Sequence, residues 1–245
     1  MTVVIGNCVL GERPRVALVV RDDISRKDVE PFFTEGVDLL EMRIDQFCSC
    51  ESEYVCSHLK TFAGLPCIGT IRSNQEGGNW SGSETLRLAL YKKIMPFVNA
   101  VDIEINAEEI NNAVIEEAKR VGAVVIGSFH DFKSTPSADC LEGVLEKGKL
   151  SGVDIIKIAA QCNVSDDLRI LTHFLVTHDM DNLILLGMGH AGAPSRLFFP
   201  FLGSLVTYTF LGTPSAPGQF NCLDTISLIK KISGPFAMRH SPHKQ

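Results

Sequence analysis

The chain has 245 residues, of which 45% are hydrophobic and 21% charged, and its formal net charge is −6. These proportions are typical of a globular protein, and the acidic balance argues against a nucleic acid or an anionic membrane surface as the partner. No apolar run approaches the ~18 residues of a membrane span, and the N-terminus lacks the basic and apolar regions of a signal peptide. We therefore expect a cytoplasmic protein with a small-molecule partner, in which the eight cysteines remain reduced.

Short apolar runs rich in β-branched residues recur along the chain, and each is followed by a polar stretch long enough for a helix. Runs without strict alternation are typical of strands buried on both faces of a parallel sheet. Ser83 to Phe97 and Ala107 to Val121 have helix-spaced apolar positions with charges between them. Eight such units predict a (β/α)8 TIM barrel. The expected strands are Arg15 to Val20, Leu39 to Asp45, Cys67 to Ile71, Val101 to Ile105, Val124 to His130, Ile155 to Ala160, Leu183 to Met188 and Leu205 to Phe210.

The two ends of the chain lie outside this pattern. Thr2 to Leu10 can pair with itself as a β-hairpin that closes the bottom of the barrel. We expect residues 1–233 to form a single TIM-barrel domain. Residues 234–245 contain two prolines and several basic residues without periodicity, which predicts a disordered tail or the stub of a linker.

A short motif occurs three times and supports the repeated unit. The copies are Gly36 to Glu41, Ala100 to Glu104 and Gly152 to Lys157, and each contains Val-Asp followed by an apolar residue. In the first and third copies a charged residue follows three positions after the Asp. The repeat therefore predicts that Glu41 and Lys157 lie at one level of the sheet.

Lys157 and His130 are the strongest candidates for chemistry. Lys157 lies in the apolar strand Ile155 to Ala160, where burial would lower the pKa of its ammonium and prepare it to form a Schiff base with a carbonyl compound. An ion pair with a buried Glu explains the same lysine equally well. His130 lies at a strand C-terminus, the face on which barrel active sites are built, and fits a general base. The alternative is a structural cap made with Asp131.

Further charged residues lie at the expected strand ends. Glu41 and Arg43 share one face of the second strand, while Arg72 and Glu76 lie at the end of the third strand and in its loop. An internal ion-pair network explains each pair alone. Several charges collected at strand C-termini favour a polar ligand.

Two later loops carry polar groups that could bind a ligand. Arg196 follows the seventh strand and suits a bidentate clamp on a carboxylate, while the glycine spacing of its loop fits no nucleotide motif. Ser215 and Gln219 follow the eighth strand, although their segment as a turn needs no function. No metal site is expected, because one cysteine-rich stretch fits no standard zinc spacing. That stretch contains Cys48, Cys50, Cys56 and His58.

Taken in order, these motifs resemble type I 3-dehydroquinate dehydratase, and the resemblance runs from the first strand to about Gln219. The motifs are Glu41-Met42-Arg43-Ile44-Asp45, Thr70-Ile71-Arg72 with Glu76-Gly77-Gly78, His130-Asp131-Phe132, Lys157, the loop with Arg196, and Ser215-Ala216-Pro217-Gly218-Gln219. Members are (β/α)8 barrels that convert 3-dehydroquinate to 3-dehydroshikimate in the shikimate pathway, with no metal or organic cofactor. The resemblance therefore implies a lyase that acts on 3-dehydroquinate.

The resemblance also implies roles for single residues. Lys157 would form an imine with the C3 ketone, His130 would act as general base and acid, and Glu76 would orient His130. One departure concerns the first strand, where members often carry a Ser and this chain has Ala17. The implied substrate-binding residues are Glu41, Arg43, Arg72, Met188, Arg196, Ser215 and Gln219.

The resemblance bears on partners as well. Family members occur fused to shikimate dehydrogenase, so the expected assemblies are a homodimer, or a fusion to or association with that enzyme.

Two other functions fit part of the pattern. A class I aldolase-type Schiff-base lyase also needs a strand lysine, although its substrates are usually phosphorylated and we find no phosphate-binding loop. A catalytically silent barrel used as a binding domain would be indicated by a Lys157 that titrates normally and by failure to bind 3-dehydroquinate.

Overall fold

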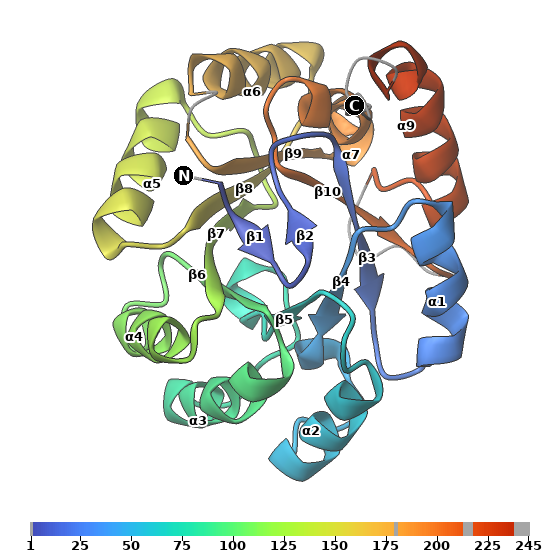
Figure 1. Cartoon of the computed structure of the whole chain (residues 1–245). Helices are drawn as coiled ribbons and strands as arrows, with labels where there is room; N and C mark the ends of the chain where they lie inside the picture. The colour runs from blue at the N-terminus through green and yellow to red at the C-terminus, as the bar shows by residue number, and fades with distance from the viewer. Residues whose placement is uncertain (1, 179–180, 213–217, 238–245) are drawn as a thin grey trace.

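Eight parallel strands form a TIM barrel in the computed structural model, which describes residues 2–178, 181–212 and 218–237. The strands are β3 Arg15–Val20, β4 Leu39–Arg43, β5 Cys67–Thr70, β6 Ala100–Glu104, β7 Val124–Asp131, β8 Ile155–Gln161, β9 Leu183–Met188 and β10 Val206–Phe210. Their order in the sheet is β10-β3-β4-β5-β6-β7-β8-β9. Between β9 and β10, Leu205 N donates a hydrogen bond to Leu183 O across 2.8 Å, so the sheet nearly closes on itself (Figure 1).

The helices surround the barrel (Figure 1). Amphipathic sequences produce them: α4, for example, buries Val114, Ile115 and Ala118 and turns charged residues outward. No helix among the residues just given is both long and apolar enough to cross a membrane. The α-helices are α1 Arg26–Glu35, α2 Ser52–Thr61, α3 Glu84–Ile94, α4 Asn111–Val121, α5 Ala138–Ser151, α6 Ser165–Thr177, α7 Gly189–Gly192, α8 Ser195–Phe198 and α9 Cys222–Ala237, and the 3-10 helices are η1 Ile44–Gln46, η2 Asn74–Glu76, η3 Met95–Phe97 and η4 Phe199–Phe201.

Inward-facing side chains form layers across the barrel because they alternate along each strand. The layer nearest the amino ends of the strands is apolar. A hairpin of β1 Val4–Ile5 and β2 Cys8–Val9 lies across this end of the barrel and buries Ile5, Cys8 and Leu10 against it (Figure 1). Polar side chains begin one layer further toward the carboxyl ends. The apolar layer consists of Ala17, Leu39, Ile68, Ala100, Ile126, Ile155, Ile184 and Val206.

The predicted barrel and its N-terminal hairpin are confirmed. Strands β3 and β9 have the predicted bounds, and the others differ only at their ends. The helix expected from Ala107 begins instead at Asn111, because residues 107–110 first form turns in which Ala107 O accepts from Ile110 N and Asn111 N. The one expected from Ser83 to Phe97 divides into α3 and η3.

The C-terminal segment differs from the expectation of a disordered tail over residues 234–245. Helix α9 continues through Ala237 in spite of Pro235, so the first four residues of that segment are helical. The rest of the predicted tail, residues 238–245, lies outside the described residues.

A prediction concerns the contact between α5 and β8, the strand that carries Lys157. A Cβ at Gly148 would lie 2.8 Å from Ile156 Cγ1, whereas a Cβ at Gly143 of the same helix meets nothing within 4 Å. Gly148→Ala should lower the free energy of unfolding by about 1–3 kcal/mol through overpacking. Gly143→Ala should raise it by up to about 1 kcal/mol, because alanine favours helix. Urea unfolding measures both, and equal effects would contradict this packing.

Candidate functional site

A cavity opens at the carboxyl ends of the strands and is lined by charged side chains together with apolar and aromatic ones. It contains every site residue expected from the sequence except Ser215, which lies outside the described residues. The family resemblance thus picks out side chains that converge in space from six strands and the loops that follow them. The lining includes Glu41, Arg43, Arg72, Glu76, His130, Phe132, Lys157, Ala159, Leu186, Met188, Arg196, Tyr208 and Gln219.

Lys157 is buried in the polar layer of the barrel and makes ion pairs with two carboxylates. Its Nζ lies 2.9 Å from Asp102 Oδ2 and 3.3 Å from Glu41 Oε1. Burial acts to lower the pKa of Lys157, but Asp102 and Glu41 outweigh burial and raise the pKa above its ordinary value. The expected lowering of the pKa is therefore wrong for the free protein, because the sequence argument counted desolvation without the neighbouring anions.

The internal repeat correctly predicted that Glu41 and Lys157 lie at one level of the barrel, where they form an ion pair, but its middle copy was aligned three residues out of register. Asp38 Oδ2 accepts a hydrogen bond from Val16 N, and Asp154 Oδ2 accepts one from Val125 N. The equivalent hydrogen bond before β6 is accepted by Asn99 Oδ1 from Cys67 N of β5. Asn99 is thus the equivalent of the two aspartates. Asp102, three residues later, is the equivalent of Glu41 and Lys157.

Asp102 is the main functional candidate that the sequence reasoning missed, and Arg72 holds it from the other side. Arg72 Nη2 lies 2.6 Å from Asp102 Oδ1, and Nη1 donates to Ser128 Oγ. Burial acts to raise the pKa of Asp102, but Arg72 and Lys157 outweigh it and hold the pKa well below its usual range. An acidic residue inside the apolar run of β6 was the available signal.

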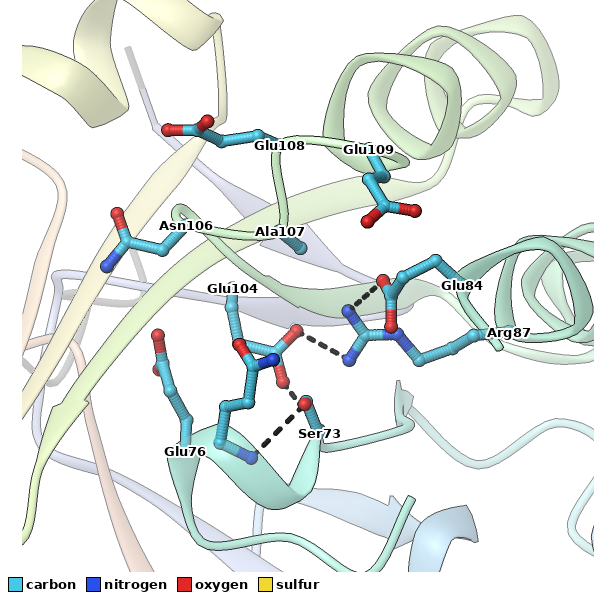
Figure 2. Close-up of a pocket in the computed structure, with 10 residues that line it drawn as sticks. Ser73, Glu76, Glu84, Arg87, Glu104, Asn106, Ala107, Glu108 and Glu109 are labelled. Atoms are coloured by element: carbon cyan, nitrogen blue, oxygen red, sulfur yellow. Dashed lines mark hydrogen bonds and ion pairs between the residues drawn. The ribbon is translucent and has the colours of Figure 1, made fainter. Parts of the chain in front are cut away.

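A second row of charges supports Arg72 from the side facing α3. Glu104 Oε1 lies 3.3 Å from Arg72 Nη1 and accepts a hydrogen bond from Ser73 N at 2.7 Å, while Glu104 Oε2 lies 2.9 Å from Arg87 Nη1. Figure 2 shows Glu104 between Arg87 and Ser73 at the edge of a neighbouring pocket, which shares Glu76 with the site cavity. Glu104 thereby fixes both Arg72 and the start of the loop that carries Glu76.

His130 and Glu76 form a hydrogen-bonded pair at the mouth of the cavity. Glu76 Oε2 accepts from His130 N at 3.0 Å and lies 2.9 Å from His130 Nδ1. Phe132 stacks beside the imidazole, with ring centroids 6.3 Å apart. Because Nδ1 faces the carboxylate, Nε2 is the nitrogen left to react with a ligand.

Opposite shifts of the two pKa values follow from this setting. Burial lowers the pKa of His130 well below 6.5, and repulsion from Arg72 and Lys157 lowers it further. Burial raises the pKa of Glu76 to about 8, against the opposing effect of Arg72. The imidazole is therefore uncharged at neutral pH and able to accept a proton.

The remaining expected residues form the rim and wall. Arg43 makes a bidentate ion pair with Asp45, through Nε at 3.0 Å and Nη2 at 2.9 Å. Arg196 is buried, and burial lowers its pKa to about 10. Met188 supplies an apolar wall on β9.

On the first barrel strand, Ala17 belongs to the apolar layer and does not line the cavity. The β3 residue in register with Glu41 is Val19, which is also apolar. Tyr208 on β10, which the sequence analysis did not select, lines the cavity, and its ring lies 4.2 Å from Lys157 Nζ.

Together the fold and the cavity define a TIM barrel with a buried lysine beside a histidine–glutamate pair. The family model described as Type I 3-dehydroquinase matches residues 16–232. A curated 3-dehydroquinate dehydratase of Thermodesulfovibrio yellowstonii is 38% identical over 221 residues, covering 89% of this chain and 95% of that protein. The chain therefore belongs to the type I 3-dehydroquinase family.

Solved structures agree with this membership. The crystal structure of 3-dehydroquinate dehydratase from Geobacillus kaustophilus HTA426 matches with a TM-score of 0.88 at 25% identity, covering 97% of this chain and 98% of that chain. An S. pombe chain named for both dehydroquinate dehydratase and shikimate dehydrogenase shares the fold with a TM-score of 0.71 at 24% identity, over 86% of this chain and 43% of that chain.

The raised pKa of Glu76 predicts a pH dependence of stability. The folded-state pKa of about 8 exceeds the ordinary 4.5, so the folded protein keeps a proton that the unfolded chain has released. This contribution to stability is complete below pH 4.5 and is lost as the pH rises to about 8, with a limiting slope of about 1.4 kcal/mol per pH unit.

Glu76→Gln removes this titration, so between pH 6.5 and 8 its free energy of unfolding should fall less steeply than that of the unmodified protein. Urea unfolding across this range gives the comparison. Glu53→Gln on the exposed side of α2 is the control and should leave the slope unchanged. Parallel curves for the Glu76→Gln and unmodified proteins would contradict the raised pKa.

Proposed function

We propose that this protein dehydrates 3-dehydroquinate to 3-dehydroshikimate through a Schiff base on Lys157. The observation that carries the proposal is the placement of Lys157, buried on β8 inside a cavity that also holds the His130–Glu76 pair. The family match over residues 16–232 supports the choice of reaction. The proposed chemistry uses only side chains and needs neither a metal nor an organic cofactor.

The first step is the addition of Lys157 to the C3 ketone. Nζ must release a proton before it can attack, and two carboxylates lie within reach of it. Asp102 stays ionised because Arg72 and Lys157 hold its pKa low, so we assign Glu41 as the acceptor. Glu41 then returns its proton to the hydroxyl of the carbinolamine, the former ketone oxygen leaves as water, and the nitrogen lone pair forms a protonated imine.

The second step is proton abstraction by His130. The protonated imine withdraws electrons from C2 and acidifies the hydrogen there, and uncharged His130 takes this proton through Nε2. The electron pair of the broken C–H bond forms an enamine. The electron pair of the enamine then moves to form the C1–C2 double bond and breaks the bond between C1 and its hydroxyl. His130 returns its proton to this hydroxyl, which leaves as a second water. Hydrolysis of the remaining imine consumes one water and frees Lys157.

Binding residues are proposed from their positions around this reacting centre. Arg196 would clamp the substrate carboxylate together with Gln219, because an anion stabilises a buried guanidinium. Arg43 and Glu41 lie where they could contact hydroxyl groups. Arg72 is bonded to Asp102, Ser128 and Glu104 and would act mainly by holding them in place. Ser215 remains a candidate from the family resemblance.

Assembly and location are also part of the proposal. The acidic net charge of −6 argues against a nucleic-acid partner, while the arginines that line the cavity favour a small anionic substrate. A fusion to or association with shikimate dehydrogenase is supported by the S. pombe chain named for both enzymes. A homodimer and a cytoplasmic location complete the proposal, the latter supported by reduced cysteines and the metabolic reaction.

Borohydride trapping tests the covalent step. Mixing the protein with 3-dehydroquinate and borohydride should give a ligand-sized mass increase, which peptide mass spectrometry should locate on Lys157 because reduction turns the imine into a stable amine. Lys157→Ala should lose both the adduct and turnover. Lys92→Ala, an exposed position on α3, is the control and should keep both. An adduct and normal turnover in Lys157→Ala would refute the mechanism.

A second variant separates imine formation from proton transfer. His130→Ala should still yield the borohydride adduct on Lys157, whereas turnover should fall by roughly 10²–10⁴-fold because no positioned base takes the C2 proton. Product formation followed in the ultraviolet, together with the mass measurement, gives both quantities. His173→Ala, on the exposed face of α6, should behave as the unmodified protein. Full turnover by His130→Ala would assign the base elsewhere.

A further inference from the structure

The Tyr208 hydroxyl makes no hydrogen bond of ordinary geometry within the described part of the protein, although Lys157 lies beside it. The side chain is 3% exposed, and its Oη is buried without a hydrogen-bond partner among those residues. A buried hydroxyl that gives up its water and gains no partner costs stability, and such a group calls for an explanation. Its position supplies one, because Tyr208 lines the cavity that holds Lys157.

The ring of Tyr208 contacts the reacting nitrogen. Lys157 Nζ lies over the ring at 4.2 Å from its centroid, which is a cation–π geometry. The same ammonium group makes ion pairs with Asp102 and Glu41. Oη is therefore close to Nζ and is carried on a different strand, β10, from those that carry the carboxylates. A ketone carbon that bonds to Nζ has to enter the same region.

The wall around Tyr208 is otherwise apolar. Inward positions on the neighbouring strand β3 are Ala17 and Val19, and those on β9 are Leu186 and Met188. Strands β3 and β9 thus offer no polar inward side chain at this level among the described residues, and the Tyr208 hydroxyl is the group on this wall that can donate a hydrogen bond. Burial raises the pKa of Tyr208 and outweighs the lowering effect of Lys157, so the hydroxyl keeps its proton at neutral pH.

We propose that Tyr208 is a further catalytic residue, whose hydroxyl donates a hydrogen bond to the C3 oxygen of the substrate while Lys157 adds to C3. This inference rests on the proposed function. In that step the Nζ–C3 bond forms and the π pair of the carbonyl moves onto oxygen. The nitrogen, now cationic, then loses a second proton, which neutralises that oxygen. The hydrogen bond stabilises the negative charge that develops on oxygen, and Tyr208 itself neither gains nor loses a proton.

Tyr208→Phe tests the proposal because it removes Oη and keeps the ring over Lys157. The protein is mixed rapidly with 3-dehydroquinate, quenched with borohydride at successive times and weighed by mass spectrometry. We expect the adduct on Lys157 to form at least tenfold more slowly in Tyr208→Phe, because the loss of one donor to a developing oxyanion typically slows a reaction by roughly 10²–10³-fold. Tyr54→Phe removes an exposed hydroxyl bonded to Asp22 and should leave the rate unchanged.

A stability measurement separates this role from a structural one. Tyr208→Phe should unfold at the same temperature as the unmodified protein or higher, because the variant no longer buries an unsatisfied hydroxyl. A lower unfolding temperature would show that Oη serves the fold and would overturn the proposal, as would adduct formation at the unmodified rate. If the unmodified protein itself forms no adduct on Lys157, the proposed function fails together with this inference.

Discussion

The ion pair between Lys157 and Asp102 is the constraint on which the site depends. An ammonium inside a barrel is tolerated only when anions compensate for the water that it has lost, and Asp102 and Glu41 provide that compensation from two other strands. Asp102 is buried as well and needs Arg72 in turn. The polar layer therefore has to be assembled as a unit, and the apolar layer beneath it, closed by the N-terminal hairpin, provides the rigid base.

The same charges give the two candidate catalytic groups, Lys157 and His130, different protonation states. Asp102 and Glu41 keep Lys157 protonated in the free protein, while burial, together with repulsion from Arg72 and Lys157, keeps His130 uncharged. The resting site thus holds a charged amine beside an uncharged imidazole. In the proposed mechanism, Nζ therefore has to give up a proton to Glu41 before it can attack a ketone.

A further charged row, made of Glu104 and Arg87, lies behind the first. It touches Arg72 and also Ser73, so it fixes the arginine that holds Asp102 and the loop that delivers Glu76 (Figure 2). Lys157 and His130 are thereby positioned through one shared support. Beside Tyr208, the inward side chains of β3 and β9 are apolar, while Arg196 and Gln219 line the cavity from the loops that follow β9 and β10.

Local patterns in the sequence determined the barrel, the strand positions and the residues quoted in the motifs, because burial on both faces of a strand and helical periodicity leave a signature within a few residues. They also placed Glu41 and Lys157 at one level of the sheet. The sequence did not identify Asp102, because a short repeat does not define the register between strands. It did not identify Tyr208, because an aromatic residue in a strand is usually a core residue. Only the tertiary structure decided the pKa of Lys157 and which hydroxyl is left unpaired, because those depend on charges and walls brought from strands distant in the chain.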